Sequence, residues 1–180
     1  MTSITDQPRE ASHCKTASVA VLSAPANAQM AINSDQDIVL ARQKGRALAT
    51  GIGFASGDAT LIATAISELA RNIVSYARKG QIILRMVNNL NRQGILVVAT
   101  DEGPGISDIP QALQAGFSTS GSLGLGLPGV RRLMDEFEIT SQPGRGTTVA
   151  VKKWDGQLQR LSPTETANRQ RQPPPNNVPL

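Results

Sequence analysis

The sequence predicts an α+β fold, a two-layer sandwich with helices packed on one face of a mixed, mostly antiparallel sheet. Apolar residues recur at helical spacing in some segments, and short apolar runs bounded by turn residues predict strands in others. Helices gathered against such a sheet form a two-layer architecture. At 180 residues one domain is expected, and because aromatic residues make up only 3% of the chain, its core must be aliphatic.

The first half of the expected domain carries one strand and two helices. A short strand is expected at Gln29–Asn33, and Ser34 and Asp37 can form a capping box for a helix through about Thr50. A longer helix is expected over Asp58–Arg78, with Asp58 capping its start and Gly80 marking its end. Its apolar positions at helical spacing are Leu61, Ile62, Ala65, Ile66, Leu69, Ile73 and Val74.

The second half reads as strands interrupted by short helices. The expected strands are 81–87 and 95–100, joined by a turn around 91–94, and a closing hairpin that pairs 137–141 with 147–153. Short helices are expected at 110–115 and 128–136, where Pro128 suits the first helical turn because its missing N–H costs nothing there.

Both ends differ in composition from the middle. Residues 1–27 are polar and lack periodicity, and residues 155–180 are rich in Gln, Asn and Arg and carry several prolines. We therefore expect a flexible extension at 1–27, a folded domain at 28–154 and a disordered tail at 155–180. His13 and Cys14 fall in the leading segment, and neither is expected to have a functional role.

Composition narrows the possible partners and the compartment. The net charge of +4 comes from scattered basic residues with few aromatic stacking partners, so nucleic-acid binding is not expected. No apolar run approaches the roughly 18–20 residues that span a bilayer, so no membrane association is expected. A single cysteine excludes an internal disulfide, and no signal-like apolar core follows the N-terminus, which together predict a cytoplasmic protein.

The most informative motif runs from Asp101 to Ile106, directly after the apolar segment 95–99. A buried strand would therefore deliver the Asp101 carboxylate, with Gly103 and Gly105, to its C-terminal end. A carboxylate there can accept hydrogen bonds from a base or a sugar. The glycines allow backbone to approach a flat ligand at a place where a Cβ would collide.

A second motif places Glu68 and Asn72 at positions i and i+4 of the long helix. They share one face, about 6 Å apart along the axis, and border the buried stripe of the helix. A carboxylate and an amide oxygen placed in this way suit a hard cation and the oxygens around it.

A third motif, residues 116–129, is rich in glycine and hydroxyl groups and leads into the helix expected after Pro128. Free backbone N–H groups at a helix N-terminus favour an anion, and phosphate above all. The segment is neither a Walker A loop, because no G-K-[ST] follows, nor a Rossmann fingerprint, because no strand leads directly into the glycines.

Taken in order, these motifs resemble the ATP-binding signature of the gyrase–Hsp90–histidine kinase–MutL superfamily. Glu68 and Asn72 match its N box, Asp101, Gly103 and Gly105 the first glycine box, Gly124 and Gly126 the second, and Gly146-Thr147 the closing element. The amino-acid sequences of four segments resemble those of the RsbT family, the switch serine/threonine kinases of the bacterial stressosome. These segments are 66–72, 101–106, 116–121 and 126–137.

The resemblance implies an enzyme that uses ATP and Mg²⁺ to phosphorylate a STAS-domain protein, with a PP2C-type phosphatase or another regulator downstream. It implies that Glu68 is the general base, that Asn72 ligates Mg²⁺ and that Asp101 accepts a hydrogen bond from the adenine amino group. It also implies that Thr147 supports the adenine site. The remaining nucleotide-binding residues that it implies are Gly103, Gly105, Ser118, Thr119, Ser120, Gly124 and Gly126.

Three alternatives remain open at this point. The first is an ATP-binding anti-sigma factor of the related kinase group, which would sequester a sigma factor. The second is a nucleotide-binding pseudokinase, which intact Glu68 and Asn72 disfavour. The third is a catalytic fragment of a histidine kinase, which is disfavoured because no phospho-accepting helix fits the sequence.

Overall fold

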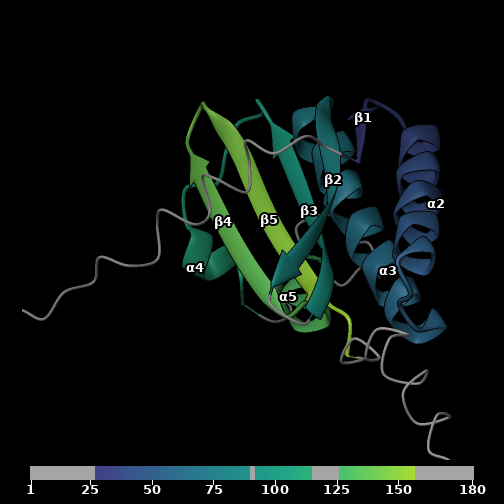
Figure 1. Cartoon of the computed structure of the whole chain (residues 1–180). Coiled ribbons are helices and arrows are strands. Elements are labelled where there is room, and N and C mark those ends of the chain that lie inside the picture. The colour runs from purple at the N-terminus through teal and green to yellow at the C-terminus, as the bar shows by residue number, and fades with distance from the viewer. Residues whose placement is uncertain (1–26, 90–91, 115–125, 157–180) are drawn as a thin grey trace, which may run out of the picture.

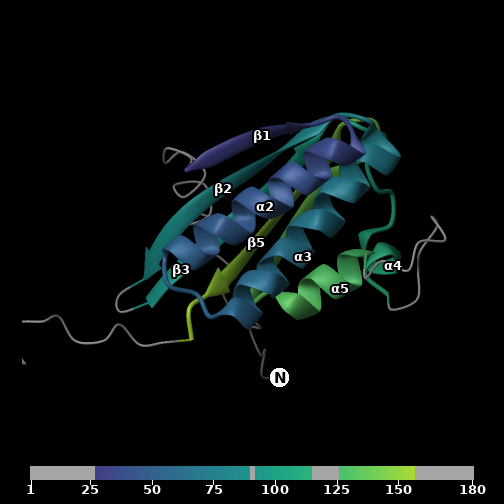
Figure 2. The ribbon, with the colours of Figure 1, turned by 90° about the vertical axis from the view of Figure 1, so that its right-hand side faces the viewer.

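A computed structural model of the chain describes residues 27–89, 92–114 and 126–156. These residues form a two-layer sandwich in which helices cover one face of a five-stranded sheet (Figures 1 and 2). In chain order the elements are β1 (Ala28–Ile32), α2 (Asp35–Gly51), α3 (Ser56–Asn72), the π-helix η1 (Ile73–Ala77), β2 (Gly80–Asn89), β3 (Arg92–Asp101), α4 (Ile109–Ala112), α5 (Gly126–Leu133), β4 (Glu136–Gln142) and β5 (Gly146–Trp154).

The sheet has the strand order β1-β2-β3-β5-β4, and all four pairings are antiparallel. The predicted fold class is therefore confirmed. Helices α2, α3 and α5 lie side by side across the same face of the sheet, as Figure 2 shows. Residues of β3, β4 and β5 on the helix-covered face of the sheet therefore lie close to residues of α3 and α5.

Local capping signals fixed the start of α2 correctly. Ser34 and Asp37 form the expected capping box, in which the Asp37 carboxylate accepts hydrogen bonds from the backbone N–H groups of Asn33 and Ser34. The predicted start of the long helix at Asp58 was wrong, whereas its predicted end at Arg78 agrees with the structure, in which the helical run reaches Ala77 and Arg78 is its C-cap. The helix begins at Ser56, after an N-cap residue, Ala55, that makes no side-chain hydrogen bond.

The far end of that helix differs from the expectation in its geometry and in the role of Gly80. After Asn72 the helix widens into η1, and Arg78 ends it in the left-handed region, at a φ of 66°. Gly80 does not cap the helix but opens β2. A Cβ on Gly80 would lie 2.5 Å from the Thr100 carbonyl oxygen and 2.9 Å from Ile73, so this glycine serves the close approach of β2, β3 and η1.

Two further boundaries differ from the sequence prediction. Asn89 pairs with Arg92, so most of the expected turn at 91–94 belongs to β3, and Gly94 makes room there for the Trp154 ring. Helix α5 spans Gly126–Leu133 rather than 128–136. It ends earlier because the Asp135 N–H donates to the Lys152 carbonyl, which turns the chain into β4.

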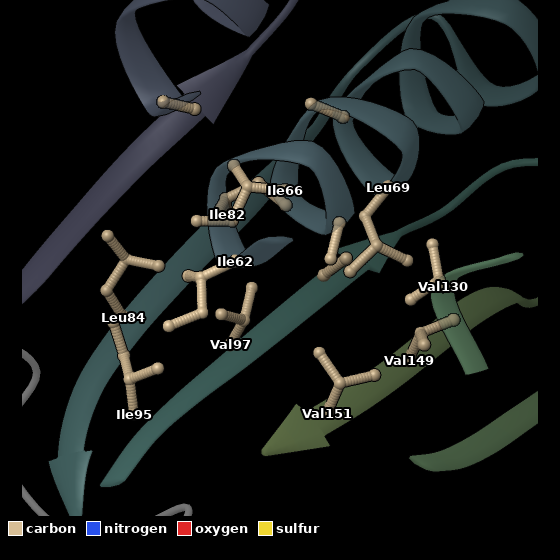
Figure 3. Close-up of a cluster of buried hydrophobic side chains, with 14 of the residues drawn as sticks. Ile62, Ile66, Leu69, Ile82, Leu84, Ile95, Val97, Val130, Val149 and Val151 are labelled. Carbon is tan, nitrogen blue, oxygen red and sulfur yellow. The ribbon is translucent and has the colours of Figure 1, made fainter. Parts of the chain in front are cut away.

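The core between the two layers is aliphatic, as expected, and Phe54 is the one aromatic side chain among its buried hydrophobic residues in the described ranges. Figure 3 shows its centre, where Ile62, Ile66 and Leu69 of α3 face side chains from β2, β3 and β5. Within the described segments, no helix is both long and apolar enough to cross a membrane.

Candidate active site

Two of the residues predicted for nucleotide binding, Asp101 and Thr147, lie at the end of the sheet that η1 approaches. In the sheet register, Asp101 at the end of β3 pairs with Thr147 near the start of β5, and Thr147 pairs with Ser141 of β4. Directly paired residues project from the same face of a sheet. Asp101, Thr147 and Ser141 therefore form one row, which we call the acceptor row, on the face that the helices cover.

The Asp101 carboxylate is oriented by its own loop. The Gly103 N–H donates to Asp101 Oδ1 over 2.8 Å. Within the described part of the chain no donor reaches Oδ2. Asp101 is only partly buried, so Oδ2 can accept a hydrogen bond from an external group such as an amino group.

The glycines of this loop allow it to pack closely against neighbouring backbone. A Cβ on Gly103 would lie 2.6 Å from the Ala77 Cβ of η1, and a Cβ on Gly105, at a φ of 70°, would overlap the Gln142 carbonyl. The sequence interpretation is that a bound ligand leaves no room for a Cβ at these positions. In the structure, the space of each Cβ is instead taken by other residues of the protein, Ala77 and Gln142. The glycines thus hold the Asp101 loop against η1 and the β4–β5 hairpin.

Glu68 lies on α3 and is buried, with a relative exposure of 9%. Its Oε2 accepts a hydrogen bond of 3.1 Å from the N–H of Gly126, the first residue of α5. This contact brings two motifs together that lie 58 residues apart in the sequence. The carboxylate is thus oriented by a backbone donor, and within the described residues no hydrogen bond to Oε1 occurs.

Asn72 is the last residue of α3, one turn after Glu68, and is partly exposed. The residues that follow it form η1, whose last residue, Ala77, contacts the Asp101 loop at Gly103. Single π-helical turns occur frequently at functional sites. Here η1 connects the Glu68–Asn72 pair with the loop that holds Asp101.

Four predicted site residues, Ser118, Thr119, Ser120 and Gly124, lie outside the described residues. Sequence reasoning also missed Ser141, although the signal was present. The predicted hairpin already placed position 141 opposite position 147, and a hydroxyl residue next to Thr147 could have been noticed there.

The described residues fit a magnesium nucleotide. Asp101 Oδ2 can accept from a base, and the amide oxygen of Asn72 is a ligand type that Mg²⁺ takes. The described ranges contain no group of three or more His, Cys, Asp or Glu side chains that could hold a metal. Mg²⁺ is commonly held by one or two protein ligands together with substrate phosphates.

A comparison with protein families matches residues 57–157 to the family described as histidine kinase-, DNA gyrase B-, and HSP90-like ATPases. The match covers more than half of the chain, and it includes Glu68, Asn72, Asp101 and Thr147. The chain belongs to this ATPase family.

Within the family, the chain is 53% identical over 123 residues to the serine/threonine-protein kinase RsbT of Bacillus subtilis (strain 168), covering 68% of this chain and 92% of that protein. The enzyme class of this chain is therefore that of a protein serine/threonine kinase.

The chain is also 34% identical over 99 residues to an anti-sigma F factor of Thermoanaerobacter sp. (strain X514), covering 53% of this chain and 69% of that protein. A solved structure, the nucleotide-free catalytic domain of histidine kinase ThkA, aligns with a TM-score of 0.42 at 14% identity, covering 71% of this chain and 96% of that one.

Proposed function

We propose that the chain uses ATP and Mg²⁺ to phosphorylate STAS-domain proteins and then engages a PP2C-type phosphatase or another downstream regulator. It would act in this way as a partner switch in a bacterial stress response, in the cytoplasm. The similarity to RsbT supports the reaction, and the similarity to both RsbT and anti-sigma F factors supports a role in switching protein partners. We further propose that residues 28–154 form the kinase domain.

The observation that carries the proposal is the buried Glu68 carboxylate, which the Gly126 N–H orients. In phosphoryl transfer to a hydroxyl, catalysis consists mainly of alignment and charge neutralisation. Glu68 takes the proton of the substrate hydroxyl at Oε1, because Oε2 is already engaged by Gly126. The γ-phosphoryl then passes from ATP to that oxygen, and ADP leaves.

The other residues hold the nucleotide. Asp101 Oδ2 accepts from the adenine amino group, Thr147 lies beside it in the acceptor row, and the Asn72 side-chain oxygen ligates Mg²⁺. The ion, when bound, neutralises charge on the phosphate oxygens. The hydroxyl and glycine residues before Gly126 contribute backbone N–H groups to the phosphates, whereas the N–H of Gly126 itself, a residue also expected to bind the nucleotide, is engaged by Glu68. For Ser118, Thr119, Ser120 and Gly124 this role stays a prediction from the sequence.

Replacement of the proposed base tests the function. Glu68→Gln keeps the shape and the acceptor for Gly126 but cannot take a proton. We expect ATP binding to persist and transfer of radiolabelled phosphate from ATP to a purified STAS-domain protein to fall by about 10²–10⁴-fold. Glu102→Gln, the same chemical change at an exposed neighbour of Asp101, is the control and should transfer at the wild-type rate. Wild-type transfer by Glu68→Gln would remove Glu68 from the mechanism.

A second candidate function is sequestration of a sigma factor, which the 34% identity to an anti-sigma F factor favours. Gel filtration of the chain with a sigma factor, in the presence of Mg-ATP or Mg-ADP, tests it. A stable complex with the sigma factor, without phosphorylation of any STAS-domain protein offered, would favour this alternative over the switch kinase.

A further inference from the structure

Ser141 joins three segments around the acceptor row. Its Oγ accepts a hydrogen bond of 2.8 Å from the Ile106 N–H, in the loop after β3. It donates to the Gly146 carbonyl over 2.9 Å, and it lies 2.8 Å from the Thr147 hydroxyl oxygen. The partly buried Ser141 hydroxyl therefore contacts the Asp101 loop and the first two residues of β5 together.

These contacts fix the direction of the bond between the two hydroxyl groups. A serine hydroxyl has one proton to donate and can accept two hydrogen bonds. A backbone carbonyl can only accept, so the bond to Gly146 uses the single proton of Ser141. The Thr147 hydroxyl must then be the donor toward Ser141, and its proton is no longer available to a ligand.

The consequence for the acceptor row is that Thr147 offers a ligand only lone pairs. Asp101, its direct partner in the sheet register, offers a carboxylate oxygen, which is also an acceptor. Two adjacent acceptors favour a base that carries an amino group at this point. They disfavour a base that carries a carbonyl there, because two facing acceptors leave both without a partner.

We propose that Ser141 is a positioning residue that holds Thr147 as an acceptor and thereby helps the site to select a 6-amino purine over a 6-oxo purine. This inference rests on the proposed function, because it assumes that the acceptor row binds the base of ATP. It adds a residue that acts on the base through Thr147 and that need not touch the nucleotide.

The test compares the affinities for ATP and inosine triphosphate, which carries a carbonyl where ATP has its 6-amino group. In Ser141→Ala the Thr147 hydroxyl loses its acceptor and can turn to donate to a carbonyl. The dissociation constant for inosine triphosphate divided by that for ATP measures the preference for the amino group. We expect this ratio to fall by about fivefold in Ser141→Ala, which corresponds to one ordinary hydrogen bond. Ser141→Thr retains a hydroxyl and should restore the wild-type ratio.

Thr100→Ala is the matched control. Thr100 pairs with Thr148 through a hydroxyl contact of 3.1 Å on the same two strands, β3 and β5. Because neighbouring residues of a strand alternate in direction, this pair lies on the opposite face from the acceptor row. Thr100→Ala therefore removes an equivalent contact and should leave the ratio unchanged.

The outcomes separate this inference from the function on which it rests. An unchanged ratio in folded Ser141→Ala, or an equal fall in Thr100→Ala, would overturn the role of Ser141. If Ser141→Ala does not fold, Thr147→Val removes the acceptor directly, and an unchanged ratio in that variant overturns the proposal as well. Failure of the wild-type chain to bind either nucleotide would instead contradict the proposed function.

Discussion

At the scale of single residues, the site depends on which hydrogen-bonding groups are already engaged by the protein and which remain for a ligand. The Gly103 N–H donates to one oxygen of Asp101, the Gly126 N–H donates to one oxygen of Glu68, and the Ser141 hydroxyl accepts the hydrogen bond of the Thr147 hydroxyl. Each functional group is thus oriented by a neighbour that itself needs no contact with the nucleotide. Such preorganisation is what a phosphoryl-transfer site requires, because its catalysis is mainly alignment.

Asn72 gives the first prediction at this scale. Because an ion that bridges the protein and the phosphates couples the binding of metal and nucleotide, Asn72→Ala should weaken ATP binding by about tenfold in Mg²⁺ and much less in its absence. Calorimetric titrations with and without Mg²⁺ measure this difference. Asn88→Ala is the control, because Asn88 is exposed near the C-terminal end of β2, and it should leave ATP binding unchanged in both conditions. Equal weakening in both conditions would show that Asn72 has a structural role only.

Two glycines of the β4–β5 turn give a second prediction. Gly144 and Gly146 both have positive φ, 73° and 85°, but no atom would lie within 4 Å of a Cβ on Gly144, whereas a Cβ on Gly146 would overlap the Asp101 carbonyl. Gly144→Ala should therefore cost only the backbone strain, about 1–2 kcal/mol. Gly146→Ala should cost a further 1–3 kcal/mol or so from overpacking. Urea unfolding of the two variants measures both costs, and equal values would contradict the close contact between β5 and the Asp101 loop.

At the scale of elements, the connection from α5 into β4 is held by two carboxylates that reach across to β5. Asp135 accepts from the Lys153 ammonium and from the Trp154 N–H, and Glu136 accepts from the Lys152 ammonium and from the Trp154 indole. Partial burial raises the pKa of Asp135, but the hydrogen bonds outweigh it and the pKa is lowered overall. The Lys152 ammonium is the main cause of the lowered pKa of Glu136.

These shifts predict how stability depends on pH. Because both pKa values are lower in the folded state, the stabilisation is complete above the unfolded values of about 4 and is lost as pH falls through the folded ones. The combined variant Asp135→Asn, Glu136→Gln should be less stable than wild type at pH 7, by about 1 kcal/mol for each partly exposed ion pair at most. The difference should shrink between pH 5 and pH 3 in denaturant unfolding. A difference that stays constant over that range would contradict the role of the two carboxylates.

Signals that act within a few residues allowed the elements to be predicted well. The capping box at Ser34 and Asp37 was correct because both of its hydrogen bonds close within one helical turn. The position of the end of the long helix was predicted at Arg78, but its geometry could not be, since the left-handed Arg78 and the widened turn before it follow from how η1 packs against the Asp101 loop. Gly80 looked like a helix cap, but its neighbours are residues of β3 and η1, which no local pattern reveals.

At the scale of the whole molecule, the site forms where segments distant in the sequence meet on the helix-covered face of the sheet. The motifs themselves, Glu68 with Asn72, Asp101 with its glycines, and Thr147, could be found in the sequence. The contacts of Glu68 with Gly126 and of Ser141 with Ile106 could not, because they span 58 and 35 residues and depend on the placement of α5 and on the pairing of β4 with β5. The orientation of each functional group is therefore a property of the assembled fold.

In the proposed site the acceptor row binds adenine while Asn72 ligates the magnesium ion. A crystal structure of the full chain with a non-hydrolysable ATP analogue and Mg²⁺ tests both parts at once. We expect the 6-amino group of the base within hydrogen-bond distance of Asp101 Oδ2, Thr147 beside it with Ser141 still in contact, and the ion bound by the Asn72 side-chain oxygen. A base bound away from Asp101 and Thr147, or an ion that does not contact Asn72, would show that the nucleotide and its metal bind in a different way from the one proposed.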